Sequence, residues 1–289
     1  VKVAIYSRAT DEEMAIQLPG LIDALNKQKI DIVLLQRLPM NSHLMMHNIP
    51  YLENTEELDA SVDFLISLGG DGTMLDAVTL VKDKNIPILG INFGRLGFLA
   101  GIGKNELASA VDALVNGTYL IDKRSLIHVE ADSPLFGNMP FALNEFALHK
   151  RDLSPMIKIH TYLNGEFLNT YWSDGVIVST PTGSTGYNMS CNGPIIFPDS
   201  GSFVITPIAP HNLNIRPIVV PDNHIISFEI EGRIDQFICS LDARREIVEK
   251  NIQIAVKKED FTISLVRLSE NSFLGTLRTK LSWGLDKRN

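Results

Sequence analysis

Cysteine is scarce in this sequence: Cys191 and Cys239 are the only two among 289 residues. Two cysteines are too few for a disulfide framework or for a zinc site built from cysteine. So low a cysteine content is typical of a protein that works in a reducing compartment. We therefore expect a cytoplasmic location.

Long apolar runs and an excess of basic residues are also missing. No stretch approaches the roughly 18 consecutive apolar residues that predict a membrane-spanning helix. The formal net charge is −8, whereas a general nucleic-acid surface needs a basic face. Residues 1–6 are typical of a β-strand rather than of a secretion signal. We expect neither a membrane nor a nucleic acid as a partner.

Several catalytic motifs are absent as well. The chain has no G-x-x-x-x-G-K-[ST] loop and no G-x-G-x-x-G spacing, which excludes a Walker-type phosphate loop and the usual dinucleotide fingerprint. It has no H-E-x-x-H pair and no G-x-S-x-G elbow, so a zinc hydrolase and a serine hydrolase have no support. We predict no metal site built from protein side chains.

The first part of the chain alternates between two kinds of apolar pattern. Short apolar runs predict strands at residues 2–6, 31–35, 62–68 and 86–92, and helical spacing predicts helices at residues 21–28, 74–81 and 105–115. Such alternation is typical of an α/β domain with a Rossmann-like parallel sheet and helices on its faces. Ligands of these domains bind beyond the carboxyl ends of the strands.

After Gly117 the pattern changes to short strands joined by turns. Asn164-Gly165, between apolar runs at 157–163 and 167–172, predicts a tight hairpin. We expect an α/β domain at 1–118 and a β-rich, β-sandwich-like domain at 119–270. The polar segment 37–61 fits neither pattern, and we interpret it as a cover over the site.

A glycine turn carries the first candidate site. Gly69-Gly70-Asp71-Gly72-Thr73 follows the apolar run 62–68 and opens the expected helix. Glycines accept unusual backbone angles and let a phosphate or ribose approach the main chain. The single acid, Asp71, is then placed to take a proton from an incoming hydroxyl. The alternative is that Asp71 only caps the helix, because aspartate is a favoured N-cap.

A second loop is rich in hydroxyl groups. Thr182-Gly183-Ser184-Thr185-Gly186-Tyr187 comes shortly after the apolar run 175–178. Short hydroxyl side chains can bind phosphate and ribose oxygens with little loss of side-chain entropy. A flexible Ser/Thr/Gly linker is the alternative interpretation.

These two loops, together with Asn144-Glu145, Ser173-Asp174-Gly175 and Ser240-Leu241-Asp242, resemble the NAD kinase family. The segment 90–99, Gly-Ile-Asn-Phe-Gly-Arg-Leu-Gly-Phe-Leu, is a further match. A lone Gly-Gly-Asp-Gly is also similar to phosphofructokinases and lipid kinases. The ordered set, running from Gly69 to Asp242, is far more specific.

The resemblance implies an enzyme that transfers the γ-phosphate of ATP to the 2′-hydroxyl of the adenosine ribose of NAD, which gives NADP. Asp71 would act as the catalytic base, and Mg²⁺ would bridge the donor phosphates. The residues implied to bind phosphate are Gly69, Gly70, Gly72 and Thr73. The residues implied to bind NAD are Asp71, Gly72, Asn144, Glu145, Asp174, Thr182, Thr185, Gly186, Tyr187, Asn188, Met189, Ser190 and Arg244.

The resemblance also implies a homodimer or homotetramer in which Asp174 reaches a dinucleotide bound mainly by the neighbouring subunit. It implies that the tail at 271–289 returns to the first domain. Gly186 departs from the family, which usually has alanine there, and Arg244 lies where the family has a polar residue.

Other interpretations remain open. One alternative is that Asn144 and Glu145 are only the polar, exposed part of a strand. Adjacent strand residues point to opposite faces, so the two side chains bind one ligand only where the strand is irregular or ends. A lipid kinase would share the glycine turn, and a non-catalytic dinucleotide-binding regulator would keep both loops.

Overall fold

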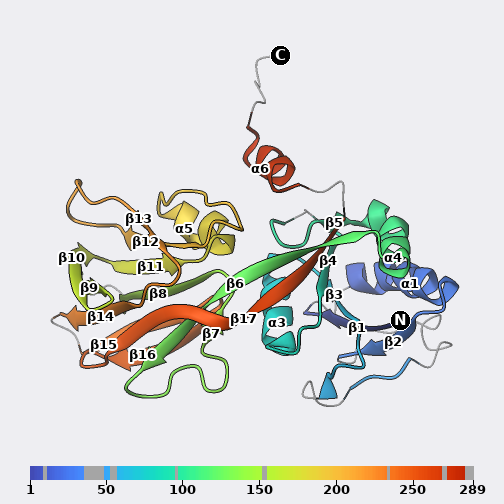
Figure 1. Cartoon of the computed structure of the whole chain (residues 1–289), viewed down its shortest axis with the longest axis horizontal. Helices are drawn as coiled ribbons and strands as arrows, with labels where there is room; N and C mark the ends of the chain where they lie inside the picture. Colours follow the sequence, from blue (N-terminus) through green and yellow to red (C-terminus); the bar gives the residue numbers. More distant parts are fainter. Residues whose placement is uncertain are drawn as a thin grey trace. The chain divides into compact units, whose positions relative to one another are not determined.

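Two compact units make up the chain (Figure 1). The computed structural model describes residues 1–8, 12–35, 49–52, 57–94, 97–151, 155–232, 235–268 and 272–283, without the side chains of 12–15. Unit 1 comprises Val1–Lys123 and Ile263–Asn289, and unit 2 comprises Arg124–Thr262. Much of the segment 37–61, which we interpreted as a cover, lies outside the described residues.

Unit 1 contains a parallel sheet in the order β4-β3-β1-β2. The short strand β5 pairs in parallel with β4, and the end of β17 pairs with β4 at Leu265 and Ile88. The strands of unit 1 are β1 (Lys2–Ser7), β2 (Asp31–Leu34), β3 (Phe64–Leu68), β4 (Ile88–Asn92) and β5 (Ile102–Gly103). β3 is buried along its whole length, as expected of a strand covered on both faces.

This sheet is covered by α1 (Glu12–Lys27), α3 (Asp71–Val81) and α4 (Leu107–Asn116), with the turn η2 (Lys104–Glu106) before α4. A further helix, α6 (Phe273–Leu281), lies near the end of the chain. In Figure 1, α1 and α4 lie on one side of the strands and α3 on the other. Leu21 and Leu25 of α1 join Val111 and Leu114 of α4 in one buried cluster. Gly117 ends α4 with φ +66°, the left-handed conformation that glycine adopts at low cost.

Unit 2 contains two antiparallel layers. One has the order β10-β9-β14-β17, with β6 paired to β17 and β7, and the other is a six-stranded sheet in the order β13-β12-β11-β8-β15-β16. The first layer consists of β6 (Tyr119–Ala131), β7 (Phe141–Ala142), β9 (Ile157–Leu163), β10 (Glu166–Ser173), β14 (Ile226–Glu231) and β17 (Ile254–Leu268). The second consists of β8 (Glu145–Lys150), β11 (Gly175–Ser179), β12 (Ser202–Ile208), β13 (Ile218–Pro221), β15 (Gln236–Leu241) and β16 (Arg244–Glu249).

The inner faces of these two layers form one core. Phe146 of β8 and Phe228 of β14 stack with ring centroids 6.0 Å apart, and both are fully buried within the same cluster. Asn164 and Gly165 have φ +50° and +83°, which confirms the tight hairpin between β9 and β10. The α/β fold followed by a β-rich, sandwich-like region is therefore confirmed.

Candidate active site

The glycine turn lies where β3 leaves the parallel sheet. Gly69 has φ +147°, and a Cβ there would stand 2.3 Å from Oγ1 of Thr73, so this position requires glycine. Gly70 is the N-cap of α3, and Asp71 is the first helical residue. The first N–H groups of a helix have no partner within it. The turn therefore presents backbone donors at the positive end of the helix dipole.

The carboxylate of Asp71 does not cap α3, because the N-cap residue is Gly70. Instead it accepts three consecutive backbone N–H groups from the segment after β4. Oδ1 accepts from Leu99 at 2.9 Å and Ala100 at 3.1 Å, and Oδ2 accepts from Phe98 at 2.8 Å. A carboxylate offers about four acceptor positions, so one position on Oδ2 remains for a ligand. The capping interpretation of Asp71 is therefore wrong.

Gly97 makes this arrangement possible. A Cβ at Gly97 would stand 1.7 Å from Oδ1 of Asp71, far inside contact distance. The stretch at 90–99 that the sequence resemblance included thus supplies two of the three donors that orient Asp71, and Ala100 directly after it supplies the third. Residues 95 and 96 of the stretch lie outside the described residues.

Unit 2 holds a second carboxylate of the same kind. Oδ1 of Asp242 accepts the backbone N–H groups of Asn144 at 2.8 Å and Glu145 at 3.1 Å, and Oδ2 accepts that of Leu143 at 3.0 Å. Desolvation raises the pKa of Asp242, and these three bonds offset part of the rise. Asp242 thereby fixes the turn that leads into β8. Since β8 begins at Glu145, Asn144 lies before the strand, and the two residues do not alternate along it.

Glu145 is the most unusual acid of unit 2. Its side chain is buried, and among the described residues its Oε2 atom has no hydrogen-bond partner. A Cβ on Gly186 would lie 3.3 Å from that oxygen, so Glu145 faces the hydroxyl-rich loop. Burial, followed by the charge of Asp242, raises the pKa of Glu145 to about 8, against a smaller opposing effect from the N–H of Tyr187. The carboxyl is mostly protonated at neutral pH and can donate as well as accept.

The hydroxyl-rich loop forms η3 (Thr182–Thr185) and α5 (Tyr187–Ser190), and it packs against the turn at 143–145. Thr180 Oγ1 donates to the carbonyl oxygen of Leu143 at 2.6 Å and accepts from the N–H of Gly183 at 3.1 Å. A Cβ on Gly183 would stand 2.1 Å from the carbonyl oxygen of Asn144. The loop is thus a built structure, and the linker interpretation is wrong.

The loop has an inner and an outer side. Asn188 is fully buried; its Nδ2 donates to the carbonyl oxygens of Ser184 at 3.0 Å and Pro194 at 2.9 Å, and its Oδ1 accepts from Thr206 at 2.6 Å. Thr182 is buried and accepts from Arg124 at 3.1 Å. The residues at least partly exposed on the outer side are Thr185, Gly186, Tyr187, Met189 and Ser190.

Two predicted residues have side chains that protein groups engage. Asp174 precedes β11 and forms an ion pair with Lys150 at 2.7 Å. Its charge also acts on Tyr187 of the loop, whose pKa is raised mainly by burial and further by nearby negative charges. Arg244 donates to the carbonyl oxygens of Met139, at 2.5 Å, and Phe141.

Other side chains near the two turns were not among the predicted site residues, although Asn92 lies in the matched segment 90–99. In unit 1, Nη1 of Arg8 lies 3.5 Å from the place of a Cβ on Gly72, and Nδ2 of Asn92 lies 3.6 Å from that of a Cβ on Gly70. In unit 2, the charge of Arg245 acts on Tyr187 and on His149. Arg8 and Asn92 lie at carboxyl ends of parallel strands, and that position was the signal available for finding them.

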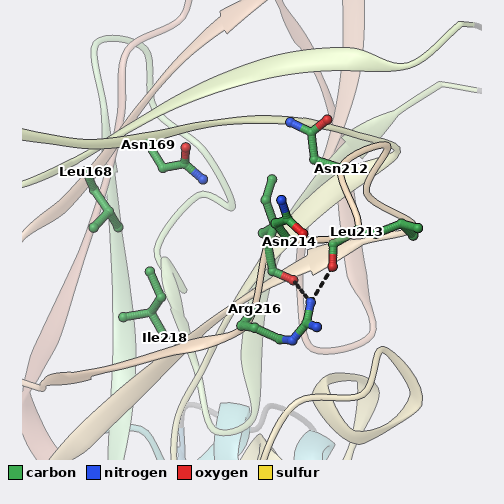
Figure 2. A pocket seen from close by; sticks show the side chains of 8 residues that line it. Leu168, Asn169, Asn212, Leu213, Asn214, Arg216 and Ile218 are labelled. Carbon is green, nitrogen blue, oxygen red and sulfur yellow. Dashed lines mark hydrogen bonds between the residues drawn. The ribbon is translucent and has the colours of Figure 1, made fainter.

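A separate hollow of about 640 Å³ lies between β10 and the loop before β13 (Figure 2). The Nη1 atom of Arg216 donates to the carbonyl oxygens of Leu213 at 2.5 Å and Ile215 at 2.9 Å, so its charge is used within the loop. The residues that line the hollow are Leu168, Asn169, Asn212, Leu213, Asn214, Ile215, Arg216 and Ile218. They include none of the predicted site residues.

Comparisons with known proteins agree with this geometry. The model of the ATP-NAD kinase N-terminal domain matches residues 14–119, and that of the ATP-NAD kinase C-terminal domain matches residues 143–268. The NAD kinase of Cytophaga hutchinsonii is 58% identical over 227 residues, 78% of either chain. The NAD kinase of Flavobacterium psychrophilum is 42% identical over 294 residues, which cover 100% of both.

Solved structures show the same fold. The yeast NADH kinase complexed with NADH has a TM-score of 0.88 at 22% identity, covering 99% of this chain and 89% of that one. An NAD kinase from Archaeoglobus fulgidus in complex with ATP has a TM-score of 0.75 at 26% identity, covering 98% and 99%. The chain belongs to the NAD kinase family.

Proposed function

We propose that this chain is an NAD kinase that transfers the γ-phosphate of ATP to the 2′-hydroxyl of the adenosine ribose of NAD and releases NADP. The observation that carries the proposal is the carboxylate of Asp71, which three backbone N–H groups orient at a glycine turn while one acceptor position on Oδ2 remains. The relatives named NAD kinase, and the solved structures with NADH and with ATP, support the same substrates.

The chemistry assigned to unit 1 is proton transfer and phosphate binding. Phosphoryl transfer depends mainly on positioning and on charge neutralisation. The open position on Oδ2 of Asp71 accepts the proton of the ribose hydroxyl as the new P–O bond forms. Backbone N–H groups of Gly70 and Gly72, with the hydroxyl of Thr73, bind phosphate oxygens at the start of α3. Gly69 contributes through its conformation, because its own N–H donates to the carbonyl oxygen of Ile91 at 2.9 Å.

A divalent cation such as Mg²⁺ fits this site as a companion of the nucleotide. Mg²⁺ in such sites uses one or two carboxylates beside the substrate's phosphate oxygens. Within the described ranges, no group of three or more His, Cys, Asp and Glu side chains is placed to hold an ion. We therefore assign its ligands to the donor phosphates, with Asp71 as the neighbouring carboxylate. When bound, it neutralises phosphate charge.

The acceptor NAD is assigned to unit 2. Asn144 and Glu145 bind ribose hydroxyls, and Glu145 has the unpartnered oxygen that such a contact would satisfy. The outer side of the loop contributes Thr185, Gly186, Tyr187, Met189 and Ser190. The side chains of Thr182, Asn188 and Arg244 already bind protein groups. We therefore assign these residues to the NAD site because they shape it.

We also propose a homodimer or homotetramer that works in the cytoplasm. In this assembly Asp174 would contact a dinucleotide bound mainly by the neighbouring subunit, as the family resemblance implies. The free thiols of Cys191 and Cys239 suit a reducing compartment. Among the described residues, no helix is both long and apolar enough to cross a membrane. We assign nucleotide binding to residues 1–118, NAD binding to 119–270 and a returning tail to 271–289.

An assay with ATP, Mg²⁺ and either NAD or diacylglycerol tests the proposal. NADP should form, and phosphatidic acid should not. Formation of phosphatidic acid would identify a lipid kinase instead. NAD binding without any product, in a preparation that also binds ATP, would identify a regulator.

The variant Asp71→Asn tests the base. An asparagine side chain has one acceptor oxygen and one NH₂ group, whereas the three backbone N–H groups need acceptors on both sides of the carboxylate. In either orientation of the amide, its NH₂ group therefore faces another N–H donor, which is unfavourable. We expect kcat to fall by about 10² to 10⁴ and the free energy of unfolding to fall by about 1–3 kcal/mol. The control is Asp112→Asn, an exposed acid on α4, which should change neither quantity. Turnover above about a tenth of the native rate would disprove the role of Asp71.

A further inference from the structure

Arg8 directly follows strand β1 of the parallel sheet and lies beside the glycine turn. In the β1–β3 pairing, Ser7 is opposite Leu68, and Ser7 Oγ donates to the carbonyl oxygen of Leu68 at 2.9 Å. The next residues along the two strands are Arg8 and Gly69. Carboxyl ends of neighbouring parallel strands are where ligands of such sheets bind, so Arg8 is placed at the proposed phosphate site.

An acid on α3 holds the guanidinium of Arg8 in one orientation. Arg8 Nε donates to Oδ2 of Asp76 at 2.7 Å, and Nη2 donates to Oδ1 at 2.5 Å. Tyr6 donates its hydroxyl to Oδ2 of the same carboxylate at 3.1 Å. Burial, followed by the charge of Asp76, raises the pKa of Tyr6 to about 12, so the hydroxyl stays a donor at physiological pH. A two-bond pairing of this kind fixes the plane of the guanidinium.

The third nitrogen of that plane is directed at the turn. Nη1 takes no part in the pairing with Asp76, and it lies 3.5 Å from where a Cβ on Gly72 would stand. Gly72 is exposed, and 55% of the Arg8 side chain surface is exposed. A ligand at the turn can therefore reach the two N–H bonds of Nη1.

We propose that Arg8 is a phosphate-binding residue of this site, whose Nη1 donates to a phosphate oxygen of ATP bound at Gly69–Thr73. The inference rests on the proposed function, since it assigns Arg8 to the donor rather than to the acceptor substrate. An exposed ion pair contributes little to stability. The pairing with Asp76 acts mainly by orienting the guanidinium.

The test compares Arg8→Met and Arg8→Lys with the native protein. A charge-assisted hydrogen bond to phosphate corresponds to roughly a 10- to 100-fold change in affinity. In Arg8→Met we expect KM for Mg·ATP to rise by that factor while KM for NAD stays within about twofold. Arg8→Lys should recover only part of the loss, because an ammonium group lacks the planar fork. The matched control is Arg278→Lys, an exposed arginine of α6, which should leave both KM values unchanged.

A binding experiment separates this inference from the proposed function. By calorimetry without NAD, Arg8→Met should weaken binding of Mg·tripolyphosphate as much as that of Mg·ATP, with the thermal midpoint retained. Native kinetics in all Arg8 variants, or a rise in KM for NAD alone, would overturn the assignment of Arg8. A native protein that makes no NADP would instead overturn the proposed function. The affinity of Asp76→Asn for Mg·ATP should lie between those of the native protein and Arg8→Met, because the charge of Arg8 remains while its guanidinium is held less firmly.

Discussion

At the scale of single residues, two carboxylates are held by the same device and differ in their surroundings. Asp71 accepts the N–H groups of residues 98–100, and Asp242 accepts those of residues 143–145. Desolvation raises the pKa of Asp242, and both of its oxygens are used to fix the turn before β8. Asp71 is half-buried and keeps one position for a ligand. We interpret the device as structural at Asp242, and we propose that at Asp71 it prepares the catalytic base.

Gly97 gives a sharp test of how Asp71 is positioned. In Gly97→Ala the new methyl group would stand 1.7 Å from Oδ1 of Asp71, so the carboxylate must move. We expect kcat to fall at least tenfold although residue 97 is not proposed to touch substrate; displacements of about 1 Å have costs of up to about 10²-fold. Steady-state kinetics with NAD and ATP measures the effect.

Gly101→Ala is the matched control for that variant. A Cβ there meets no atom within 4 Å, so activity should stay native. Equal activity of the two variants would show that the segment 97–100 does not determine where the Asp71 carboxylate lies.

Glu145 predicts a pH dependence of stability. Its pKa rises from an ordinary 4.5 to about 8 in the folded protein, so the native state holds the proton more tightly than the unfolded chain. The resulting stabilisation is complete below about pH 4.5 and is lost as the pH rises through about 8. The free energy of unfolding should decline across this window by at most about 1.4 kcal/mol per pH unit.

Glu145→Gln removes this titration while keeping an acceptor for the N–H of Tyr187. Urea unfolding at pH 6 and pH 8.5 should show the variant gaining stability relative to native protein as the pH rises. Because the charge of Asp242 acts on Glu145, the comparison measures the titration of Glu145 together with its coupling to Asp242. A difference that is independent of pH would contradict a raised pKa at Glu145.

At the scale of elements, the loop at 180–190 derives its shape from internal hydrogen bonds. Asn188 joins Ser184, Pro194 and Thr206, and a Cβ on Gly193 would stand 1.9 Å from its Oδ1. Asn188→Ala leaves buried groups unsatisfied, each at about 1–3 kcal/mol. We expect the free energy of unfolding to fall by about 2–4 kcal/mol, and NAD affinity to fall with it.

A double-mutant cycle with Thr206→Val checks the interaction between Asn188 and Thr206. Their 2.6 Å bond is buried, so removing both partners should cost less than the sum of the single changes. Strict additivity in urea unfolding would mean that the two side chains do not interact.

Elements with a strong apolar pattern could be predicted from the sequence, and those shaped by distant contacts could not. Strands β1 to β4 could be predicted because buried parallel strands are short apolar runs, whereas the two-residue strand β5 is too short to give such a pattern. The prediction of a helix at 21–28 was too short, because α1 spans Glu12–Lys27 and contains Pro19. Leu18 and Leu21, on either side of Pro19-Gly20, are both buried. Strand β6 carries charged residues along much of its length, so no apolar pattern predicted it.

The candidate site divides in the same way. The glycine turn and the hydroxyl loop are local patterns and were predicted. The donors that orient Asp71 are 27 to 29 residues away in sequence, and Arg8 reaches Asp76 across 68 residues. Strand order creates these neighbours, and no local spacing encodes strand order.

At the scale of the whole molecule, the chain passes from unit 1 to unit 2 and back. The boundaries fall inside β6 and β17, so unit 2 is one continuous segment and unit 1 is completed only by the end of the chain. Val266 lies in the buried cluster of unit 1, and Leu265 pairs with Ile88 of β4. Folding of unit 1 therefore requires residues far apart in the sequence, which raises the entropic cost of its formation.

This organisation predicts different behaviour for the two units when the chain is divided. The segment 124–262 contains both layers of its core and should unfold cooperatively in urea by itself. The segment 1–123 lacks Ile263, Leu265 and Val266, which are buried in the whole chain. At about 1.5–3 kcal/mol for each buried side chain, their loss approaches the 5–15 kcal/mol that typically stabilises a domain.

We expect 1–123 to lack a cooperative transition, and a peptide of residues 263–283 added in excess to restore one. Circular dichroism during urea titration measures both outcomes, and a stable, cooperative 1–123 would show that the returning strand is dispensable for unit 1.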